Sequence, residues 1–227
     1  MTDFIIVAFN NFKYVKFLVN SIHAYCKDYT ITIVNNGDLN MYTQLSTLHT
    51  SNTRIIQQKQ IADKENYACK YDGRIVNKAS WYHATGLTLG IQSSHHENII
   101  VLDHDVVFVE SFQDEILKLL NTNQFVSSIF DDGVGISRPY FMAFKRSLLT
   151  QYVREQGDLF PNINYKDTLG TMTLYCNENK LSYHILETNH NEHRYQQTYI
   201  NGKLFMYHYH RGAIKNHTDW EIFCGAL

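Results

Sequence analysis

Short apolar runs alternate with helical periodicity along the first part of the chain. Residues 4–9 (FIIVAF) are wholly apolar, which is typical of a strand covered on both faces. A helix is predicted next, because apolar residues recur at three- and four-residue spacing, namely Tyr14, Val15, Leu18, Val19, Ile22 and Cys26. Residues 30–38 (TITIVNNGD) predict a second strand that ends in turn-forming residues. This order predicts an α/β protein whose mainly parallel sheet has helices on both faces.

The alternation continues and then becomes less regular. Residues 79–93 are predicted to be helical, with Gly86 and Gly90 spaced so that the helix backbone can lie close to the sheet. A strand is predicted next in residues 98–110 (NIIVLDHDVVFVE), followed by a helix through residues 115–120. The rest of the chain indicates mixed strands and loops.

The composition indicates a single domain over residues 1–227. The chain is 44% apolar and 14% aromatic, so it can bury a sizeable core. It has 2 prolines, and neither a low-complexity linker nor an internal repeat divides it. The formal charge is −2 and lysine and arginine form no run, which argues against a nucleic-acid partner.

Cysteine usage and hydropathy bear on where the protein works. Its 4 cysteines form no Cys-x-x-Cys pair, which favours free thiols in a reducing compartment. Residues 1–11 (MTDFIIVAFNN) carry an acidic residue where a signal peptide carries positive charge. No segment has the apolar length of a membrane span. We therefore expect a cytoplasmic protein, although peripheral association with a membrane or a partner protein stays open.

Two carboxylates interrupt an apolar run at Asp103 and Asp105. Ligands of open α/β sheets bind beyond the carboxyl ends of strands, and Asp103 ends the apolar stretch 99–102. In an extended chain, residues two apart project from the same face. Carboxylates held this close repel each other unless a cation offsets the repulsion, and Mg²⁺ or Mn²⁺ takes such oxygen ligands together with phosphates. The alternative is a pair of loop carboxylates in water.

The chain resembles the metal-dependent glycosyltransferases of the GT-A fold, particularly the family-2-like members. The resemblance covers roughly residues 3–215 and is carried by the first strand and helix (7–22), the second strand ending (33–38), and the segments 81–91 and 97–108. It implies a nucleotide-binding half at about 1–110 and an acceptor half, with a segment that completes the metal site, at about 111–227.

The resemblance also implies roles for individual residues. It implies that Asp103 and Asp105 form the Asp-x-Asp motif, which holds Mn²⁺ or Mg²⁺ against the diphosphate of a nucleotide-sugar. Further donor-binding residues implied by it are Phe9, Asn10, Asn36, Lys78 and His83. The family carries Asp at the position of Asn35 or Asn36, and an amide can donate as well as accept, so the preference for uracil stays open. A surface lysine and a helix-face histidine are the alternative interpretations of Lys78 and His83.

A second constellation lies in residues 204–215 (LFMYHYHRGAIK). His208 and His210 alternate on a predicted strand, so both rings project to one side. Such a pair can also be purely structural. The family has a late histidine that completes the metal site, followed by glycine and a basic residue that meets the diphosphate. His208, Gly212 and Lys215 resemble this pattern, with His208 preferred to His210 as the metal ligand.

Sugar transfer also requires a base for the acceptor hydroxyl. Residues 138–149 and 164–176 resemble the acceptor half of these enzymes, where an aspartate stands at the start of a helix. Asp167 is therefore the candidate general base, with Asp131 and Asp132 behind it. An aspartate at a helix start is equally a normal N-cap.

Together these residues predict an enzyme that transfers a sugar from a nucleotide-diphosphate donor to a glycan or other hydroxyl acceptor. We expect the donor to be a UDP-sugar and the transfer to invert the configuration of the anomeric carbon. A sugar-phosphate nucleotidyltransferase is one alternative, but residues 8–14 (AFNNFKY) lack the glycine-rich phosphate loop expected there. The other is a non-catalytic carbohydrate- or nucleotide-binding module.

Overall fold

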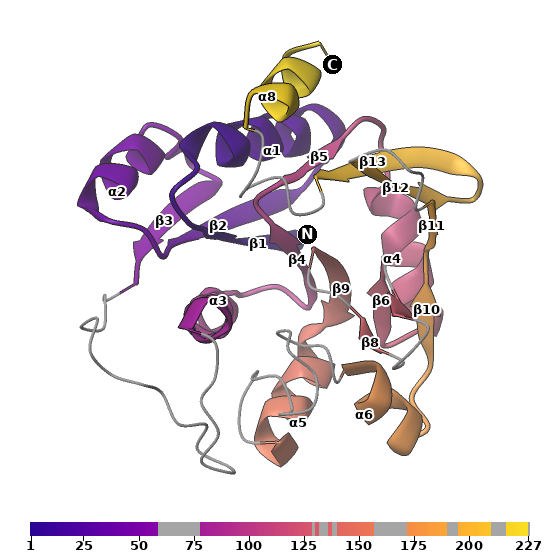
Figure 1. Cartoon of the computed structure of the whole chain (residues 1–227). Coiled ribbons are helices and arrows are strands. Elements are labelled where there is room, and N and C mark those ends of the chain that lie inside the picture. The colour runs from indigo at the N-terminus through magenta and orange to yellow at the C-terminus, as the bar shows by residue number, and fades with distance from the viewer. Residues whose placement is uncertain are drawn as a thin grey trace.

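The computed structural model describes residues 1–58, 78–128, 130–131, 136–137, 140–156, 172–189, 195–209 and 217–226. Strands and helices alternate along the first half of these residues, as the hydrophobic pattern predicts (Figure 1). The helices are α1 (Phe12–Tyr25), α2 (Leu39–Ser46), α3 (Lys78–Gln92), α4 (Gln113–Thr122), α5 (Arg146–Gln156), α6 (Met172–Glu178) and α8 (His217–Gly225).

A seven-stranded sheet forms the centre of the molecule. In spatial order its strands are β10 (Tyr183–Ile185), β6 (Phe125–Ser127), β9 (Phe141–Lys145), β4 (Asn98–Asp103), β1 (Thr2–Ala8), β2 (Tyr29–Asn35) and β3 (Thr53–Gln57). Strands β4, β1, β2 and β3 are parallel neighbours, as are β10 and β6, whereas β9 runs antiparallel to β4 and β6. The prediction of a mainly parallel central sheet is confirmed.

Helices cover both faces of this sheet, which explains why β1 is apolar at every position from Phe4 to Ala8. Phe4 and Ile6 of β1 pack in a core with side chains of α1, α2 and α4. Ile5 and Val7 project the other way, into a core with side chains of α3, α5 and α6. A strand buried on both faces cannot show the alternation of a half-exposed strand.

The helix α3 packs closely on the sheet, and two of its residues are glycines at the contact. A Cβ atom added at Gly90 would lie 2.5 Å from Cγ2 of Ile5, and one added at Gly86 would lie 3.0 Å from Cγ1 of Val7. Ordinary van der Waals contact begins at 3.4 Å. The expectation that these glycines allow close approach of the helix is therefore confirmed.

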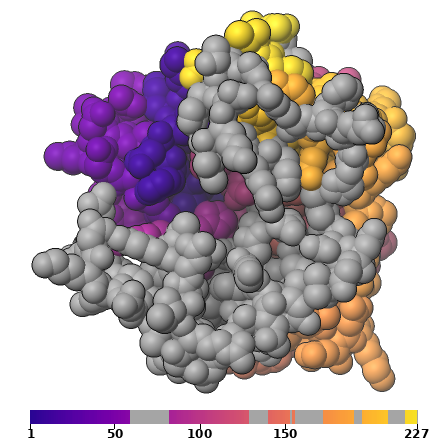
Figure 2. Space-filling model, viewed as in Figure 1, coloured from indigo at the N-terminus to yellow at the C-terminus, as the bar shows by residue number. Residues whose placement is uncertain are grey.

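A smaller four-stranded sheet is connected to the central one by the turn that follows β4. It comprises the antiparallel strands β11 (Glu187–Asn189), β12 (Tyr195–Ile200), β13 (Lys203–Tyr209) and β5 (Val106–Phe108). Strands β7 (Phe130–Asp131) and β8 (Ile136–Ser137) form a two-stranded sheet. In the space-filling view, residues of the β12–β13 region and the N-terminal elements lie on opposite sides of the visible face (Figure 2).

The strand predicted over residues 98–110 is divided in the structure. Its first part, β4, belongs to the central sheet, and its second part, β5, belongs to the smaller sheet. A turn at His104 and Asp105 separates them, so the expectation of an extended chain through Asp105 is wrong. The two acidic residues stand at the junction of the two sheets because the chain leaves one sheet and enters the other at this point.

The described cysteines Cys26, Cys176 and Cys224 are buried free thiols, and burial raises the pKa of each to about 12. Cys69 lies outside the described residues. Within the described part of the chain, no helix is both long enough and apolar enough to cross a membrane.

Candidate functional site

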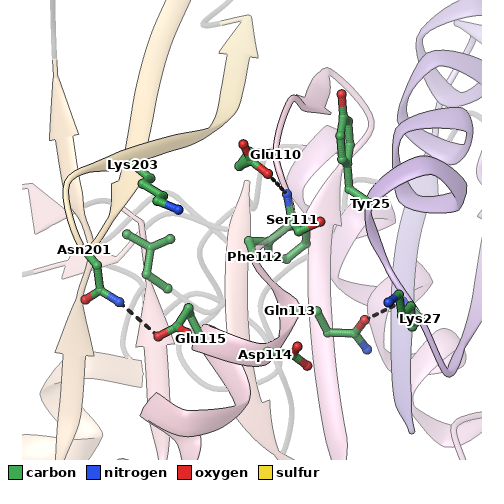
Figure 3. A pocket seen from close by; sticks show the side chains of 11 residues that line it. Tyr25, Lys27, Glu110, Ser111, Phe112, Gln113, Asp114, Glu115, Asn201 and Lys203 are labelled. Carbon is green, nitrogen blue, oxygen red and sulfur yellow. Dashed lines mark hydrogen bonds between the residues drawn. The ribbon is translucent and has the colours of Figure 1, made fainter.

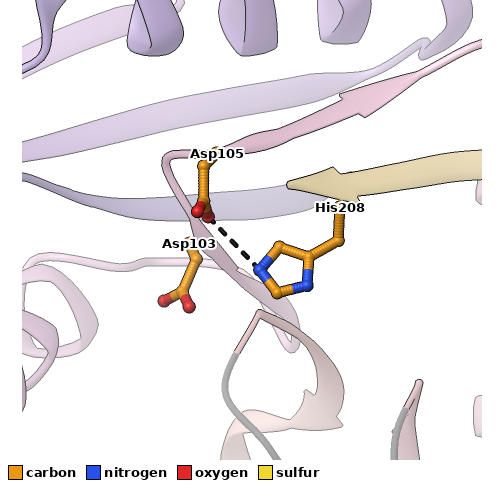
Figure 4. Close-up of side chains that lie close together, drawn as sticks. All are labelled: Asp103, Asp105 and His208. Atoms are coloured by element: carbon orange, nitrogen blue, oxygen red, sulfur yellow. Dashed lines mark ion pairs between the residues drawn. The ribbon is translucent and has the colours of Figure 1, made fainter. Parts of the chain in front are cut away.

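Asp103, Asp105 and His208 converge at the junction of the two sheets (Figure 4). Asp103 is the last residue of β4, and Asp105 lies in the turn that follows. Strand β13 pairs with β5 so that His208 stands opposite Val106, and the backbone N–H of Tyr209 donates to the carbonyl of Asp105 over 2.9 Å. One ligand atom from each of the three side chains lies within 4.8 Å of the other two.

The imidazole of His208 is held on several sides. Its Nε2 lies 3.4 Å from Oδ1 of Asp105, and both residues are buried. Its Nδ1 lies 2.8 Å from Oε1 of Gln196 on β12. The ring also stacks on Tyr140, with 4.0 Å between ring centroids and 14° between planes. Nε2 therefore faces the carboxylates while the rest of the ring is fixed by the protein.

His83 contacts the other carboxylate. The helix α3 brings its Nε2 to within 3.2 Å of Oδ1 of Asp103. Burial raises the pKa of Asp103, but the hydrogen bond with His83 and the nearby charges of His83, His208 and His104 outweigh burial and lower the pKa below its usual value of 3.8. Asp103 is therefore ionised at neutral pH, as a metal-binding carboxylate must be.

The ends of β1 and β2 present polar and aromatic residues at the same edge of the sheet. Val7 of β1 pairs with Asp103, so the loop that begins with Phe9 and Asn10 lies beyond the same strand ends. The side chain of Phe9 is 56% exposed, and Asn10 adopts a left-handed conformation with φ of 49°. An exposed aromatic ring beside a polar turn can stack on a planar ligand.

The two asparagines that end β2 have different environments. Asn35 is fully buried and structural, because its amide donates to the carbonyl of Asp38 over 3.0 Å and its Oδ1 accepts from the N–H of Gly37 over 2.9 Å. Asn36 donates to the carbonyl of Tyr82 on α3 over 2.7 Å. Its Oδ1 is buried and has no hydrogen-bond partner among the described residues. Of the two asparagines, Asn36 is therefore the one whose side-chain oxygen accepts no hydrogen bond from the described residues.

Several predicted site residues fall outside what the structure describes. Asp167, Lys215, Asp132, His210 and Gly212 belong to segments that are not described. Lys78 begins α3 and Asp131 ends β7, but the description does not extend to either side chain. Their predicted roles therefore stay predictions.

Two partners of His208 were not predicted as site residues, Tyr140 and Gln196. Tyr140 precedes β9, a strand whose partners are far away in sequence, so no local pattern connects it to His208. For Gln196 a signal exists in the Asn201-Gly202 pair, since this dipeptide favours a tight hairpin turn and hence the pairing of β12 with β13. Both turn residues have positive φ, 51° and 74°, as that turn requires.

A separate cavity of about 410 Å³ opens at the opposite end of the smaller sheet (Figure 3). It lies between the end of α1, the start of α4 and the β12–β13 turn. Lys203 on its rim begins β13, whereas His208 is near the end of that strand. Glu115 in this cavity is paired with Lys118 at 2.6 Å and accepts from Asn201 at 3.0 Å. This cavity is not part of the acidic site.

The cluster of Asp103, Asp105 and His208 has the donor set of a divalent cation site. Carboxylate oxygens suit Mg²⁺ and Mn²⁺, and an imidazole nitrogen is a further ligand for first-row metals. One ligand atom from each of the three residues already lies within 4.8 Å of the other two, so a single divalent ion could be held by all three.

Comparisons with known proteins give the fold. No family model matches the chain, and no curated protein matches its sequence. Among solved structures it is similar to mannosyltransferase PcManGT from Pyrobaculum calidifontis, in complex with GDP-Man and Mn²⁺, at 11% identity and a TM-score of 0.57 over 85% of this chain and 58% of that one. It is also similar to S. aureus TarS 1-349 in complex with UDP-GlcNAc, at 12% identity and a TM-score of 0.54 over 90% of this chain and 57% of that one.

A third similar structure is the glycosyltransferase GlyE of Streptococcus pneumoniae TIGR4, at 11% identity and a TM-score of 0.50 over 82% of this chain and 45% of that one. The chain therefore spans little more than half the length of PcManGT and TarS 1-349, and less than half that of GlyE. These neighbours and the mostly parallel, helix-covered sheet agree with the resemblance in the sequence. The chain has the GT-A glycosyltransferase fold.

Proposed function

We propose that this protein is a glycosyltransferase that transfers a sugar from a nucleotide-diphosphate donor to a hydroxyl group of a glycan or similar acceptor. The observation that carries the proposal is the convergence of Asp103, Asp105 and His208 beyond the carboxyl end of β4 in a GT-A fold. Ligands of open α/β sheets bind at this edge. The similar structures, which include complexes with GDP-Man and with UDP-GlcNAc, support a nucleotide-sugar as the donor.

Asp103, Asp105 and His208 would hold one Mn²⁺ or Mg²⁺ ion. Such an ion, when bound, neutralises the negative charge that develops on the departing diphosphate. His83 keeps Asp103 oriented and ionised through its 3.2 Å contact. Burial of Asp105 and His208 keeps bulk water from competing for the same atoms.

The donor nucleotide would lie along the edge formed by the ends of β1 and β2. Phe9 offers an exposed ring for stacking on the base, and Asn10 and Asn36 offer polar groups beside it. Lys78 and Lys215 are proposed to meet the phosphates. A UDP-sugar is the first donor to test, because the uracil N–H can donate to an asparagine Oδ1.

The acceptor hydroxyl must lose a proton as it attacks the anomeric carbon. We assign the general base to Asp167, with Asp131 and Asp132 as the alternatives, and we assign inversion of configuration. A single displacement of this kind needs only one base on the face of the sugar opposite the leaving group. Comparing Asp167→Asn with Asp131→Asn and Asp132→Asn separates these assignments.

The test is release of nucleoside diphosphate from a panel of UDP- and GDP-sugars with Mn²⁺ or with EDTA. The variant Asp105→Asn removes one charge from the cluster, and Asp114→Asn is a matched control on the exposed surface of α4. We expect turnover of at least one donor by the unmodified protein and the control. We expect a loss of about 100-fold or more in Asp105→Asn, the order of effect seen when one charge-stabilising group is removed.

Release that continues in EDTA or in Asp105→Asn would contradict the proposal. Binding of a donor without any turnover would instead identify a binding module. Formation of a nucleotide-sugar from a nucleoside triphosphate and a sugar phosphate would identify a nucleotidyltransferase.

A further inference from the structure

Gln196 is the polar neighbour of His208 on the side of the ring away from the carboxylates. Its Oε1 lies 2.8 Å from Nδ1 of His208, and Gln196 and His208 are 8% and 7% exposed. An amide oxygen can only accept a hydrogen bond, so this contact is a hydrogen bond when Nδ1 carries the proton. In a neutral imidazole the other nitrogen, Nε2, then carries the lone pair that a metal ion requires.

A β-bulge creates this contact. Strands β12 and β13 begin in register at Ile200 and Lys203, and continuing that register would place Gln196 opposite Tyr207. The register shifts between Thr198 and Tyr199, and beyond the shift Gln196 stands opposite His208. Directly opposite residues of an antiparallel pair share a face of the sheet, so the bulge brings the amide to the imidazole.

The ring has little freedom once this bond is made. Tyr140 stacks on one face of the imidazole at a centroid distance of 4.0 Å, which fixes the plane of the ring. The bond to Gln196 fixes the rotation of the ring within that plane and selects which nitrogen is protonated. Hydrogen bonds of this kind to metal-binding histidines set both the tautomer and the orientation of the ligand.

We propose that Gln196 is a positioning residue that holds His208 in the Nδ1–H tautomer with Nε2 directed at the cation site. This inference rests on the proposed function, because it concerns the same site. Without the acceptor at position 196, the ring can be protonated at Nε2 and rotate away, and the cation loses its nitrogen ligand. Gln196 touches neither donor nor acceptor in this role and acts only through His208.

The neighbouring glutamine provides a matched control. Gln197 follows Gln196 on β12 and projects from the other face of the strand, where its Oε1 accepts from Tyr199 Oη over 2.9 Å. Gln196→Met and Gln197→Met therefore remove the same amide from opposite faces of one strand. Gln196→Glu keeps an oxygen acceptor at the same distance along the side chain and tests for rescue.

The experiment measures the dissociation constant of Mn²⁺ by titration calorimetry in the absence of donor. We expect binding to weaken about 10- to 100-fold in Gln196→Met, the usual effect of losing such a partner. We expect the dissociation constant of Gln197→Met to stay within about twofold of that of the unmodified protein, and that of Gln196→Glu to stay within about threefold. Equal affinities in Gln196→Met and Gln197→Met would overturn the inference.

A second readout needs neither metal nor activity. Long-range ¹H–¹⁵N correlation spectra report which nitrogen of the metal-free His208 ring carries a proton. We expect Nδ1–H in the unmodified protein and in Gln197→Met, and its loss in Gln196→Met. A His208 ring without a proton on Nδ1 in the unmodified protein would overturn the inference even if Gln196→Met failed to fold. A protein that shows Nδ1–H yet binds no Mn²⁺ would instead refute the proposed metal site.

Discussion

Replacing Gly90 with alanine tests how closely α3 packs on the central sheet. The added Cβ would lie 2.5 Å from Cγ2 of Ile5, and the separation must grow by about 0.9 Å to reach the 3.4 Å at which ordinary contact begins. Ile5 is fully buried in β1, which is paired on both sides with β2 and β4. Neither the strand nor its side chain can move easily, so α3 itself must shift or strain.

Two opposing effects set the magnitude. Alanine in a helix interior is favoured over glycine by about 1 kcal/mol. Forcing an extra methyl group into a packed core costs about 1–3 kcal/mol, and the upper end applies where both sides are rigid. We therefore expect Gly90→Ala to lower the free energy of unfolding by about 2 kcal/mol, or the melting temperature by about 4–8 °C for a chain of this size.

Urea unfolding followed by circular dichroism measures this change. Gly225→Ala is the control, because an added Cβ there meets no atom within 4 Å, and we expect it to change stability by about 0.5 kcal/mol or less. The clash should also disappear when Ile5 is shortened. Gly90→Ala combined with Ile5→Ala should be about 3 kcal/mol more stable than the sum of the single effects predicts, because the whole cost of the clash is returned while the helix-propensity gain remains. Additivity of the two changes would refute the assigned contact.

Two further predictions concern ionisable groups. Burial raises the pKa of Asp3, but hydrogen bonds from Ser94, Thr30 and two backbone N–H groups outweigh it and lower the pKa below 3.8. Because the folded pKa is below the unfolded value, the stability from this carboxylate is complete above pH 3.8 and is lost as the pH falls through the folded pKa. At neutral pH, Asp3→Asn should thus be less stable than the unmodified protein by about 1–3 kcal/mol. Unfolding curves recorded in acid should show this difference in stability shrinking below pH 3.8. A stability difference that does not change with pH would contradict this prediction. Burial raises the pKa of the Cys26, Cys176 and Cys224 thiols to about 12. Native protein treated with iodoacetamide at neutral pH should therefore show no modification of these three thiols by mass spectrometry. Rapid modification of any one of them would contradict its burial.

The fold of the N-terminal half was predictable because each of its elements carries a local signal. The predicted helix over residues 79–93 is α3, at Lys78–Gln92, and the predicted helix through 115–120 is α4, at Gln113–Thr122. Apolar strands buried on both faces and glycines spaced along one helix leave clear marks in a sequence. The same signals placed Asp103 at the carboxyl end of β4.

The smaller sheet and the partners of the site could not be obtained in this way. Strand β5 pairs with β13, about a hundred residues later in the chain, and such pairing leaves no periodicity in either segment. The contact of Gln196 with His208 depends in addition on a one-residue register shift. The approach of His83 to Asp103 depends on how closely α3 packs on the sheet.

The most direct test of the account is a crystal of the protein soaked with Mn²⁺ and UDP, with anomalous diffraction collected to locate the manganese. We expect one strong anomalous peak within about 2.0–2.4 Å of a carboxylate oxygen of Asp105 and of Nε2 of His208, with Asp103 and the diphosphate completing the shell. A crystal that holds UDP but shows no manganese at this cluster, with both carboxylates turned to solvent, would contradict the account.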